Sequence, residues 1–468
     1  MSKNLREWIA QMEEWLPEEF LRTHELVNPG RYECSALLEY FERQSKFPTV
    51  FFENVVDNEG HASSFRLLMN AFATTPKIAA ALGLQGANRR EVMEQYNRGQ
   101  ASPRDPVRLG KAEAAVKEIV WTGEEVNLKK LPVPRINEMD GGAYLSPIIV
   151  SRHPQTGRYN ISWNRCMVID ERHLGIWMSP RHLWSYFMTA EELGRSLPIA
   201  VVLGHHPSFF LVGAGLTKMD QDEYRVAGGV MGESVRLVDS EIFGEDLLVP
   251  ADAEIILEGE IVADKRTIEG PFGEFTGYEG PQRLSWLVEV KAVTARKDGI
   301  IVGVFGAHQD NLNAHYPIQA DIFANLRVTM PNVVDLSWVD AGAPLSMVIA
   351  MQKKSEGEPL RAAMNAFAQS NFLKHITVVD DDIDPGNLRQ VGWAVATRVQ
   401  ADRDVNILKG MQGQVLDPSL EHEIRGAGMV IDATRPLDRP YSIKATPPRE
   451  IVEKVDPDKY FWGDKKNR

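Results

Sequence analysis

The chain has 468 residues, and 52 Lys plus Arg against 65 Asp plus Glu give a formal net charge of −13. This excess of acid argues against general binding to nucleic acid or to anionic membranes. Hydrophobic residues make up 43% and charged residues 25%, which is typical of a globular chain and excludes disorder, collagen and coiled coil. At this length we expect two or three packed domains.

The sequence has two cysteines, Cys34 and Cys166. One possible disulfide cannot stabilise a chain of this size, which favours a reducing compartment. The first twenty residues carry charges every few positions, unlike a secretory signal. The most apolar stretch, residues 198–216, is interrupted by His205 and His206, which argues against a membrane span. We therefore expect a cytoplasmic protein without a nucleic-acid or membrane partner.

The spacing of apolar residues predicts the elements in chain order. The pattern from Leu5 to Leu16 predicts an amphipathic helix, followed by a second helix over about 64–83 and a polar connection over 88–108. Seven β-rich runs between about 118 and 294, separated by Gly, Pro and Asp, predict a large sheet or barrel.

The last third of the chain has a different pattern. Strand-like residues 375–379 and 404–408 flank a helical pattern that ends at Val399, so we expect a compact α/β domain. Asp384 before Pro385 predicts the start of that helix. A polar tail follows from about residue 435.

The most unusual local segment is residues 269–278, EGPFGEFTGY. Its carboxylates, Glu269 and Glu274, would point to opposite faces of a strand and lie about 140° apart on a helix. Only an irregular turn brings them together, and two glycines and a proline favour such a turn. The alternative is a surface turn whose glutamates face water.

A second segment is residues 159–168, YNISWNRCMV. Strand alternation would place Asn160 on the side opposite Arg165, which would share an apolar face with Ile161 and Trp163. A buried guanidinium needs a carboxylate or phosphate partner. The alternative is an edge strand whose Arg165 reaches solvent.

Other polar residues carry weaker signals. The acidic run 380–384 could hold Mg²⁺ at the end of a strand, or could be a solvated helix-capping device. The motifs of dinucleotide, nucleotide, serine-hydrolase and zinc-ribbon sites are absent from the sequence. No local metal signature surrounds the histidines, and each one alone is more often a satisfied polar residue than a ligand. These candidates are His182, His205, His206, His308 and His315.

Taken together, these segments resemble the UbiD family of prenylated-FMN-dependent decarboxylases over about residues 110–434. EGPFGEFTGY matches the family's most specific motif, and Asn160 with Arg165 matches an Asn followed five residues later by Arg. Residues 223–228, EYRVAG, match a third motif. The stretches VPADAEIILEGEI, VVDDDIDP and ATRVQADRDV also look like family segments.

The resemblance implies an α/β (α+β) fold. It consists of a split β-barrel flavin-binding domain with N-terminal helices and a C-terminal α/β oligomerisation domain, in a homodimer or homohexamer. The expected divisions are 1–110 for the N-terminal helical or α+β part of the cofactor-binding domain, 111–325 for the split barrel that binds prenylated flavin, and 326–468 for the C-terminal α/β domain and tail.

The resemblance also implies an activity: reversible non-oxidative decarboxylation of an aromatic, heteroaromatic or α,β-unsaturated carboxylic acid, with CO₂ as the other product. The cofactor would be prenylated FMN, which a flavin prenyltransferase supplies. Arg165, Glu269 and Glu274 match the family's Glu-Arg-Glu network, in which Glu274 would be the proton donor and the other two would tune the flavin.

Further residues are implied around the cofactor. Asn160, His182 and Glu223 match the set that holds a divalent ion on the cofactor phosphate, and their donor types suit Mn²⁺ or Mg²⁺. The family also places K⁺ nearby. Many members have a Lys near the C-terminus where this chain has Gly428, and Arg425 is the alternative source of that charge.

The residues fit this chemistry on physical grounds. Loss of CO₂ from such an acid leaves an sp² carbanion, and a modified flavin can supply the electron sink that side chains lack. Glu274, with a pKa raised by burial, could protonate the product carbon, and His308 is a candidate for the substrate pocket. The competing interpretations are an inactive or scaffolding paralogue of the same fold and an ordinary FMN-binding protein.

Overall fold

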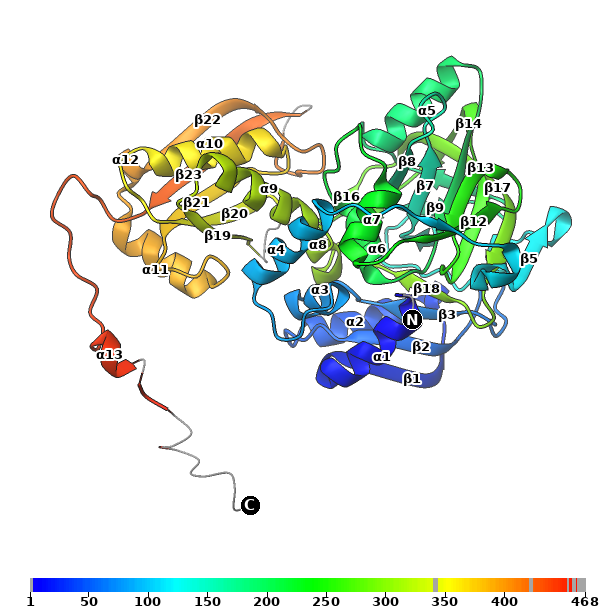
Figure 1. The fold of residues 1–468 in the computed structure, drawn as a ribbon, viewed down its shortest axis with the longest axis horizontal. Coiled ribbons are helices and arrows are strands. Elements are labelled where there is room, and N and C mark those ends of the chain that lie inside the picture. The colour runs from blue at the N-terminus through cyan, green and yellow to red at the C-terminus, as the bar shows by residue number, and fades with distance from the viewer. Residues whose placement is uncertain (1–2, 340–343, 421–423, 453, 457–459, 461–468) are drawn as a thin grey trace.

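The computed structural model contains a larger body, formed by the N-terminal and middle parts of the chain, and a smaller C-terminal body (Figure 1). The tail, as far as residue 452, leads away from the smaller body. None of the helices that the structure describes is long and apolar enough to span a membrane. The described residues are 3–339, 344–420, 424–452, 454–456 and 460.

The N-terminal region packs helices on a four-stranded sheet in the order β1-β2-β3-β18, whose last strand arrives from the middle of the chain. The predicted first helix is confirmed as α1, and Asn4 caps it by accepting hydrogen bonds from the backbone N–H groups of Arg6 and Glu7. The elements are α1 (Leu5–Trp15), β1 (Phe20–Val27), α2 (Glu33–Glu42), β2 (Thr49–Val55), β3 (Arg66–Met69), α3 (Thr75–Ala81) and α4 (Arg89–Gln100).

Two predictions in this region were wrong. The helix expected over 64–83 is a buried strand, β3, followed by the short helix α3, because pairing with β2 and β18 overrides the local pattern. The expected connection over 88–108 contains the helix α4. A capping box starts α4, in which the Asn88 side chain accepts from the Glu91 N–H and the Glu91 side chain from the Asn88 N–H.

The middle region is a curled sheet that confirms the split barrel. Its strands follow the order β6-β9-β10-β17-β14-β11-β7-β8, and β5 pairs with β17. The long strands β14 and β17 shift register near Gly259, which bends the pair. A Cβ at Gly259 would lie 2.0 Å from the carbonyl oxygen of Glu289, so only glycine fits this close approach.

The predicted β-rich runs differ from the sheet in two places. The run ESVRLVDSEIF forms β12, which belongs to a separate three-stranded sheet with β13 and β4. The run over 159–168 divides into β8 and β9, so alternation does not extend to Arg165, which lies in the break. The strands are β4 (Val107–Arg108), β5 (Ile119–Thr122), β6 (Tyr144–Leu145), β7 (Ile148–Arg152), β8 (Tyr159–Trp163), β9 (Cys166–Val168), β10 (His173–Ile176), β11 (Leu197–Val202), β12 (Arg236–Ser240), β13 (Gly244–Pro250), β14 (Ile255–Glu269), β15 (Phe272–Gly273), β16 (Glu279–Gly280), β17 (Arg283–Ala295) and β18 (Ile300–Gly303).

The helices of the middle region are α5, α6 and α7. Helices α8 and α9 come next in the chain and precede the first strand of the C-terminal body. Asn97 of α4 donates a hydrogen bond of 2.9 Å to the carbonyl oxygen of Ala320 in α9, which joins α9 to the N-terminal region. The bounds are α5 (His182–Glu192), α6 (Pro207–Ala214), α7 (Glu223–Met231), α8 (Gln309–Asn313) and α9 (Tyr316–Thr329).

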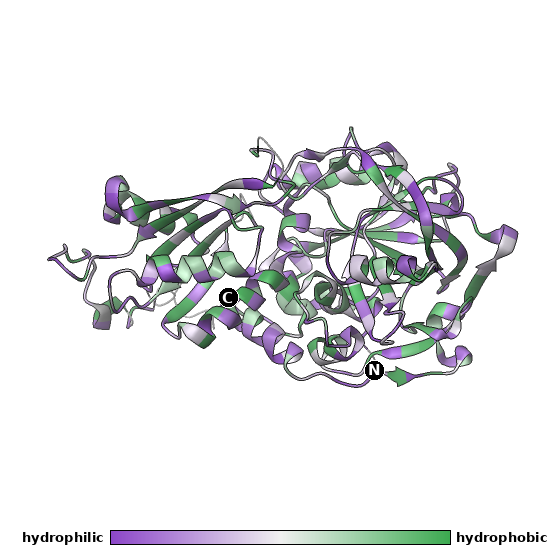
Figure 2. Ribbon diagram, turned by 90° about the horizontal axis from the view of Figure 1, so that it is seen from above, coloured by the Kyte–Doolittle hydropathy of each residue, from purple (hydrophilic) through white to green (hydrophobic). Residues whose placement is uncertain are grey.

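The C-terminal body is a five-stranded sheet in the order β19-β20-β21-β23-β22, with helices on both faces. Met347 and Ile349 of β20 pack in the core that contains α10, whereas Val348 and Ala350 pack in the core that contains α11. In Figure 2, both apolar and polar residues occur along these strands and helices. The elements are β19 (Val333–Trp338), β20 (Ser346–Met351), α10 (Glu358–Gln369), β21 (His375–Asp380), α11 (Leu388–Arg398), α12 (Ala401–Asp404), β22 (Val405–Gln412), β23 (Arg425–Ala433) and α13 (Arg449–Val452).

The expected strand, helix and strand of this domain are therefore confirmed, but the helix start was wrong. Helix α11 begins at Leu388, and the Asn387 side chain caps it by accepting from the Gln390 N–H at 3.2 Å. Asp384 instead pairs with Arg89 of α4 at 2.8 Å. The domain divisions 1–110, 111–325 and 326–468 stay predictions.

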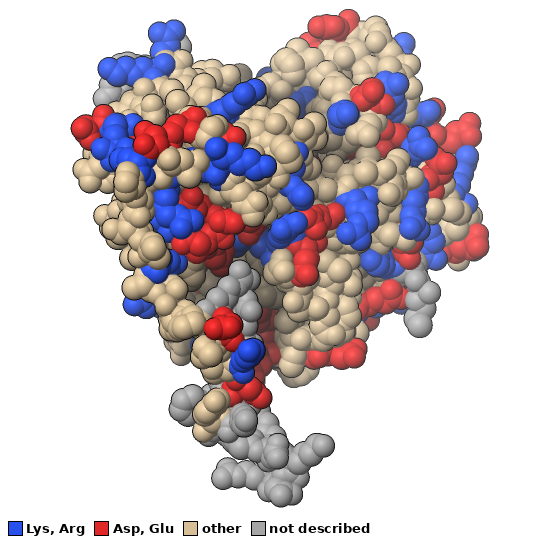
Figure 3. Space-filling model, turned by 60° about the vertical axis from the view of Figure 1, so that its left-hand side comes forward, with Lys and Arg blue, Asp and Glu red and all other residues tan. Residues whose placement is uncertain are grey.

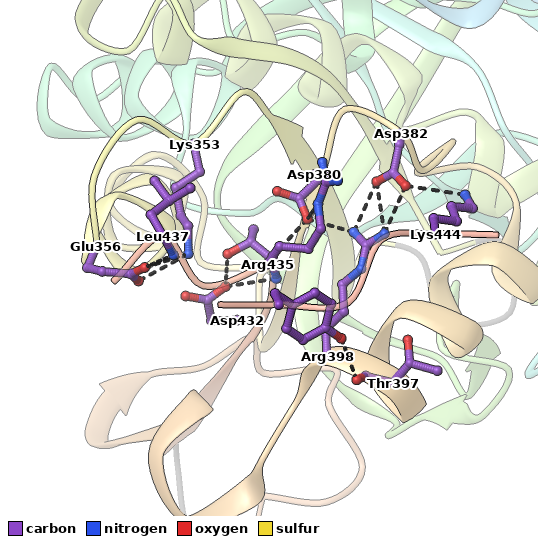
Figure 4. Close-up of polar contacts among 12 residues, drawn as sticks. Lys353, Glu356, Asp380, Asp382, Thr397, Arg398, Asp432, Arg435, Leu437 and Lys444 are labelled. Carbon is purple, nitrogen blue, oxygen red and sulfur yellow. Dashed lines mark hydrogen bonds and ion pairs between the residues drawn. The ribbon is translucent and has the colours of Figure 1, made fainter. Parts of the chain in front are cut away.

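The acidic run 380–384 is used in ion pairs (Figure 4). The buried guanidinium of Arg398 lies 2.6 Å from Asp380 and 2.9 Å from Asp382, and Lys444 of the tail lies 3.2 Å from Asp382. These contacts hold the end of α11 and the start of the tail against β21, and they leave the magnesium interpretation without support. On the face drawn in Figure 3, acidic and basic side chains are likewise interspersed.

Candidate active site

The irregular turn expected after Glu269 is present. Gly270 has φ +91° and is followed by a cis peptide to Pro271, and the next residues form the short ladder of β15 with β16. Glu269 is fully buried and Glu274 is only 7% exposed. The alternative of a surface turn with solvated glutamates is therefore wrong, because the turn folds inward against the sheet.

Arg165 joins the two carboxylates. Its Nε lies 2.9 Å from Glu269 Oε1 and its Nη2 lies 3.1 Å from Glu269 Oε2, while Nη1 forms an ion pair with Glu274. The guanidinium carbon lies 4.9 Å from the centre of the Phe272 ring. The side chain is 9% exposed, so the alternative in which Arg165 reaches solvent is wrong as well. The arrangement is one cation shared by two buried acids.

A loop over residues 137–142 supports this turn and was missed from the sequence. The buried Asp140 accepts hydrogen bonds of 2.9 Å from the N–H groups of Gly273 and Asn137, and burial raises the pKa of its carboxyl. A Cβ at Gly141 would lie 2.3 Å from the carbonyl oxygen of Gly270. The pair of glycines in DGGAY was the available signal, since such pairs permit close backbone approach.

Three other predicted residues form a second cluster, in which Asn160 and Glu223 are buried and His182 is partly exposed. The Asn160 Nδ2 group donates a hydrogen bond of 2.8 Å to Glu223 Oε2, and His182 Nδ1 lies 3.0 Å from Glu223 Oε1. The residues belong to β8, the first turn of α5 and the first turn of α7. Burial raises the pKa of the Glu223 carboxyl, and the His182 ring and nearby hydrogen-bond donors oppose this shift.

The chemistry of this cluster fits a divalent cation. Asn160 is 3% exposed, and its Oδ1 has no hydrogen-bond partner in the described part of the chain. An unpaired buried carbonyl oxygen is costly unless a ligand satisfies it. An amide oxygen, an imidazole and a carboxylate together suit Mn²⁺ or Mg²⁺.

The remaining candidates lie outside these two clusters. His308 is held by Glu42, with 3.0 Å between Nδ1 and Oε2, and its ring stacks on Phe305 at 3.6 Å. The neighbouring residue Ala307 packs against the turn, because a Cβ at Gly273 would lie only 3.2 Å from the Ala307 Cβ. His308 is therefore next in the chain to a residue that touches the turn. Arg425 is exposed at the start of β23, and no contact described in the structure joins it to the site.

The other three candidate histidines are held by burial, by a hydrogen bond at a helix start, or by aromatic packing. His205 is 1% exposed and burial lowers its pKa to about 4. The ring of His206 accepts a hydrogen bond of 3.2 Å from the Ser208 N–H at the start of α6. His315 packs against Phe275 and Phe372, with ring centres 5.3 and 5.5 Å apart.

Family models match nearly the whole chain. The N-terminal, Rift-related and C-terminal domains of 3-octaprenyl-4-hydroxybenzoate carboxy-lyase match residues 16–96, 107–308 and 313–433. The chain belongs to the UbiD family. The family assignment agrees with the resemblance carried by the turn 269–278 and by the Asn160 to Arg165 segment.

Similar proteins include decarboxylases of different acids. The phenolic acid decarboxylase of Sedimentibacter hydroxybenzoicus is 30% identical over 93% of this chain and 92% of its own. The anhydromevalonate phosphate decarboxylase of Methanothermobacter thermautotrophicus is 34% identical over 66% of this chain and 74% of its own. This UbiD-family chain is accordingly a decarboxylase of the carboxy-lyase class.

A solved structure of a UbiD-class enzyme shows the same fold over the full length. HmfF from Pelotomaculum thermopropionicum in complex with FMN has a TM-score of 0.88 at 32% identity, covering 98% of this chain and all of that one. An evolved dimeric form of HmfF in complex with prFMN has a TM-score of 0.85.

Proposed function

We propose that the protein catalyses reversible, non-oxidative decarboxylation of an aromatic, heteroaromatic or α,β-unsaturated carboxylic acid with prenylated FMN. The observation that carries the proposal is the buried pair of Glu269 and Glu274 on the shared guanidinium of Arg165. Asn160, one of the three residues of the second cluster, lies five residues before Arg165 in the chain. One segment would therefore contribute to both phosphate binding and the reacting end of the cofactor.

The residues have separate roles in this proposal. Asn160, His182 and Glu223 hold a divalent ion that neutralises the flavin phosphate, with K⁺ nearby. The bound prenylated flavin supplies the electron sink for the carbon that loses CO₂. Arg165 fixes Glu269 through two hydrogen bonds and holds Glu274 beside it through Nη1. Glu274 delivers a proton to the carbon that CO₂ leaves, and takes one back in the carboxylation direction.

The substrate side of the site is proposed to lie along His308. Its Nδ1 is held by Glu42, which leaves Nε2 as the ring nitrogen for a ligand. The relatives named above are decarboxylases of a phenolic acid and of an anhydromevalonate phosphate, so the scaffold accommodates acids of different kinds. A panel of phenolic, heteroaromatic and acyclic unsaturated acids would identify the class.

The alternatives are an inactive or scaffolding paralogue and an ordinary FMN-binding protein. A paralogue that had lost its chemistry would have no reason to retain two buried acids on one Arg, since buried charges cost folding free energy unless they are well paired. The intact network of Arg165, Glu269 and Glu274 therefore favours an active enzyme.

We expect activity only in protein produced together with a flavin prenyltransferase. The same protein carrying plain FMN, or no flavin, lacks the electron sink and should not release CO₂ from any acid of the panel. The measurement is CO₂ release alongside the mass and visible spectrum of the extracted cofactor. Equal turnover by all three preparations would contradict the proposal.

We expect His182→Ala to reduce retention of flavin and of the divalent ion together, by about tenfold or more. The imidazole is one of three donors, and loss of a donor weakens the ion that neutralises the phosphate. The measurement is flavin and metal content per chain after gel filtration, with His24→Ala as the control because that side chain is 73% exposed. Full flavin occupancy without a divalent ion in either protein would count against the assignment.

A further inference from the structure

The hydroxyl of Tyr144 lies against the carboxylate of Glu269. Tyr144 is 2% exposed and belongs to β6, where it is paired with Met167 of β9. Its Oη lies 3.0 Å from Glu269 Oε1, 3.3 Å from the carbonyl oxygen of Pro271, and 3.1 Å from the N–H of Gly270. Its ring centre is 4.5 Å from that of Phe272, which fixes the ring.

The hydrogen bonds around this hydroxyl determine where its proton points. Because the Gly270 N–H donates to Oη, the single Tyr144 proton is left for one of two acceptors. The Glu269 Oε1 atom lies 3.0 Å from the hydroxyl and the Pro271 carbonyl oxygen lies 3.3 Å from it, so Glu269 is the favoured acceptor. Burial and the neighbouring Glu269 raise the pKa of the Tyr144 hydroxyl, which keeps the hydroxyl a donor.

Glu269 therefore accepts three hydrogen bonds in a fully buried position, two from Arg165 and one from Tyr144. Each of these bonds favours the ionised carboxylate, whereas a protonated Glu269 would compete with one of the donors. Glu274 shares the same Arg165, but no hydrogen bond from Tyr144 to Glu274 is described. The two acids of the network thus have unequal environments.

We propose that Tyr144 is a positioning residue that keeps Glu269 ionised and bidentate on Arg165, so that the transferable proton resides on Glu274. The inference rests on the proposed decarboxylase function and adds a residue that lies outside the turn 269–278. It explains how two similar acids on one guanidinium take different roles.

Other titratable groups also face this position. Arg283 of β17 is the cross-strand partner of Glu269. Cys166, the first residue of β9, comes directly after Arg165 in the chain. Asp140 faces Tyr144 from the supporting loop, and Glu274 lies across Arg165. Deleting the Tyr144 hydroxyl removes none of these groups. It removes the hydrogen bond to Glu269 and the one accepted from the Gly270 N–H.

The test is Tyr144→Phe in cofactor-loaded protein, which keeps the ring packing and removes only the hydroxyl. The substitution removes one of the three donors that favour the carboxylate form of Glu269. The acidic limb of the turnover profile should therefore move to higher pH by about one to two pH units, with flavin content unchanged. Tyr316→Phe is the matched control, because it deletes another buried hydroxyl, which donates to the Arg89 carbonyl at 2.7 Å.

A second readout does not need turnover. The infrared carbonyl band of protonated carboxylic acid should appear at higher pH in Tyr144→Phe than in wild type, and its loss in the Tyr144→Phe/Glu269→Gln double variant would assign it to Glu269. In wild type, the Glu269→Gln difference spectrum should contain no such band at neutral pH, which tests the inference even if Tyr144→Phe does not fold.

The outcomes separate the inference from the function on which it rests. Coincident infrared titrations and coincident acidic limbs in wild type and Tyr144→Phe would overturn the role of Tyr144 while leaving decarboxylation intact. A lower melting temperature with no movement of either curve would show a purely structural residue and would also overturn it. Absence of decarboxylation in wild type would refute the proposed function, and the infrared titration would still decide the state of Glu269.

Discussion

Glu274→Gln is expected to lower turnover by about two to four orders of magnitude, the range that general acid catalysis contributes. Gln preserves the size of the side chain and can still contact Arg165, but it has no proton of comparable acidity to deliver. Flavin content should remain, because Glu274 lies in a different cluster from Asn160, His182 and Glu223. The measurement is turnover and flavin content in one preparation.

The matched control is Glu279→Gln. Glu279 lies in β16, directly across the ladder from Gly273, but its side chain is exposed. A surface substitution of this kind should change turnover by less than about twofold. Incorporation of solvent deuterium at the former carboxyl carbon should slow in parallel with turnover in Glu274→Gln only. Turnover near wild type in Glu274→Gln would mean that another acid delivers the proton, with Glu269 as the first candidate.

Arg165→Lys is the second substitution with a large expected effect. Lysine keeps the charge but replaces a planar fork by a point charge, and so it cannot hold Glu269 bidentately and reach Glu274 at the same time. Loss of two charge-assisted hydrogen bonds, each worth about 1.5–3 kcal/mol, corresponds to about two to four orders of magnitude in turnover. The measurement is single-turnover decarboxylation in protein of matched flavin content.

The control for this substitution is Arg172→Lys on the hairpin between β9 and β10. Arg172 is exposed and donates a 2.7 Å hydrogen bond to the Gly123 carbonyl. We expect Arg172→Lys to leave turnover within about twofold of wild type. Similar losses in the two variants would point to a general effect of the hairpin rather than to the shared guanidinium.

Several parts of this protein could be predicted because their causes are local. The turn after Glu269 is set by Gly270, Pro271 and Gly273, whose backbone preferences depend on few neighbours. The alternating strands of the middle region and the strand, helix and strand near the C-terminus also follow from short periodic patterns. Local chemistry misled the prediction at Asp384, where the neighbouring Asn387 provides the cap.

The sequence alone determined an irregular turn after Glu269 and the residues that match the family motifs, and the family resemblance supplied the class of fold. The tertiary structure decided that the turn's two acids are buried. Only the tertiary structure decided that residues 66–69 form a strand, because β2 and β18 come from distant parts of the chain. It also decided the contact of Tyr144 with Glu269, which are 125 residues apart. Such contacts depend on how the curled sheet sets β6 beside β9 and the turn beside both, and no local pattern carries that geometry.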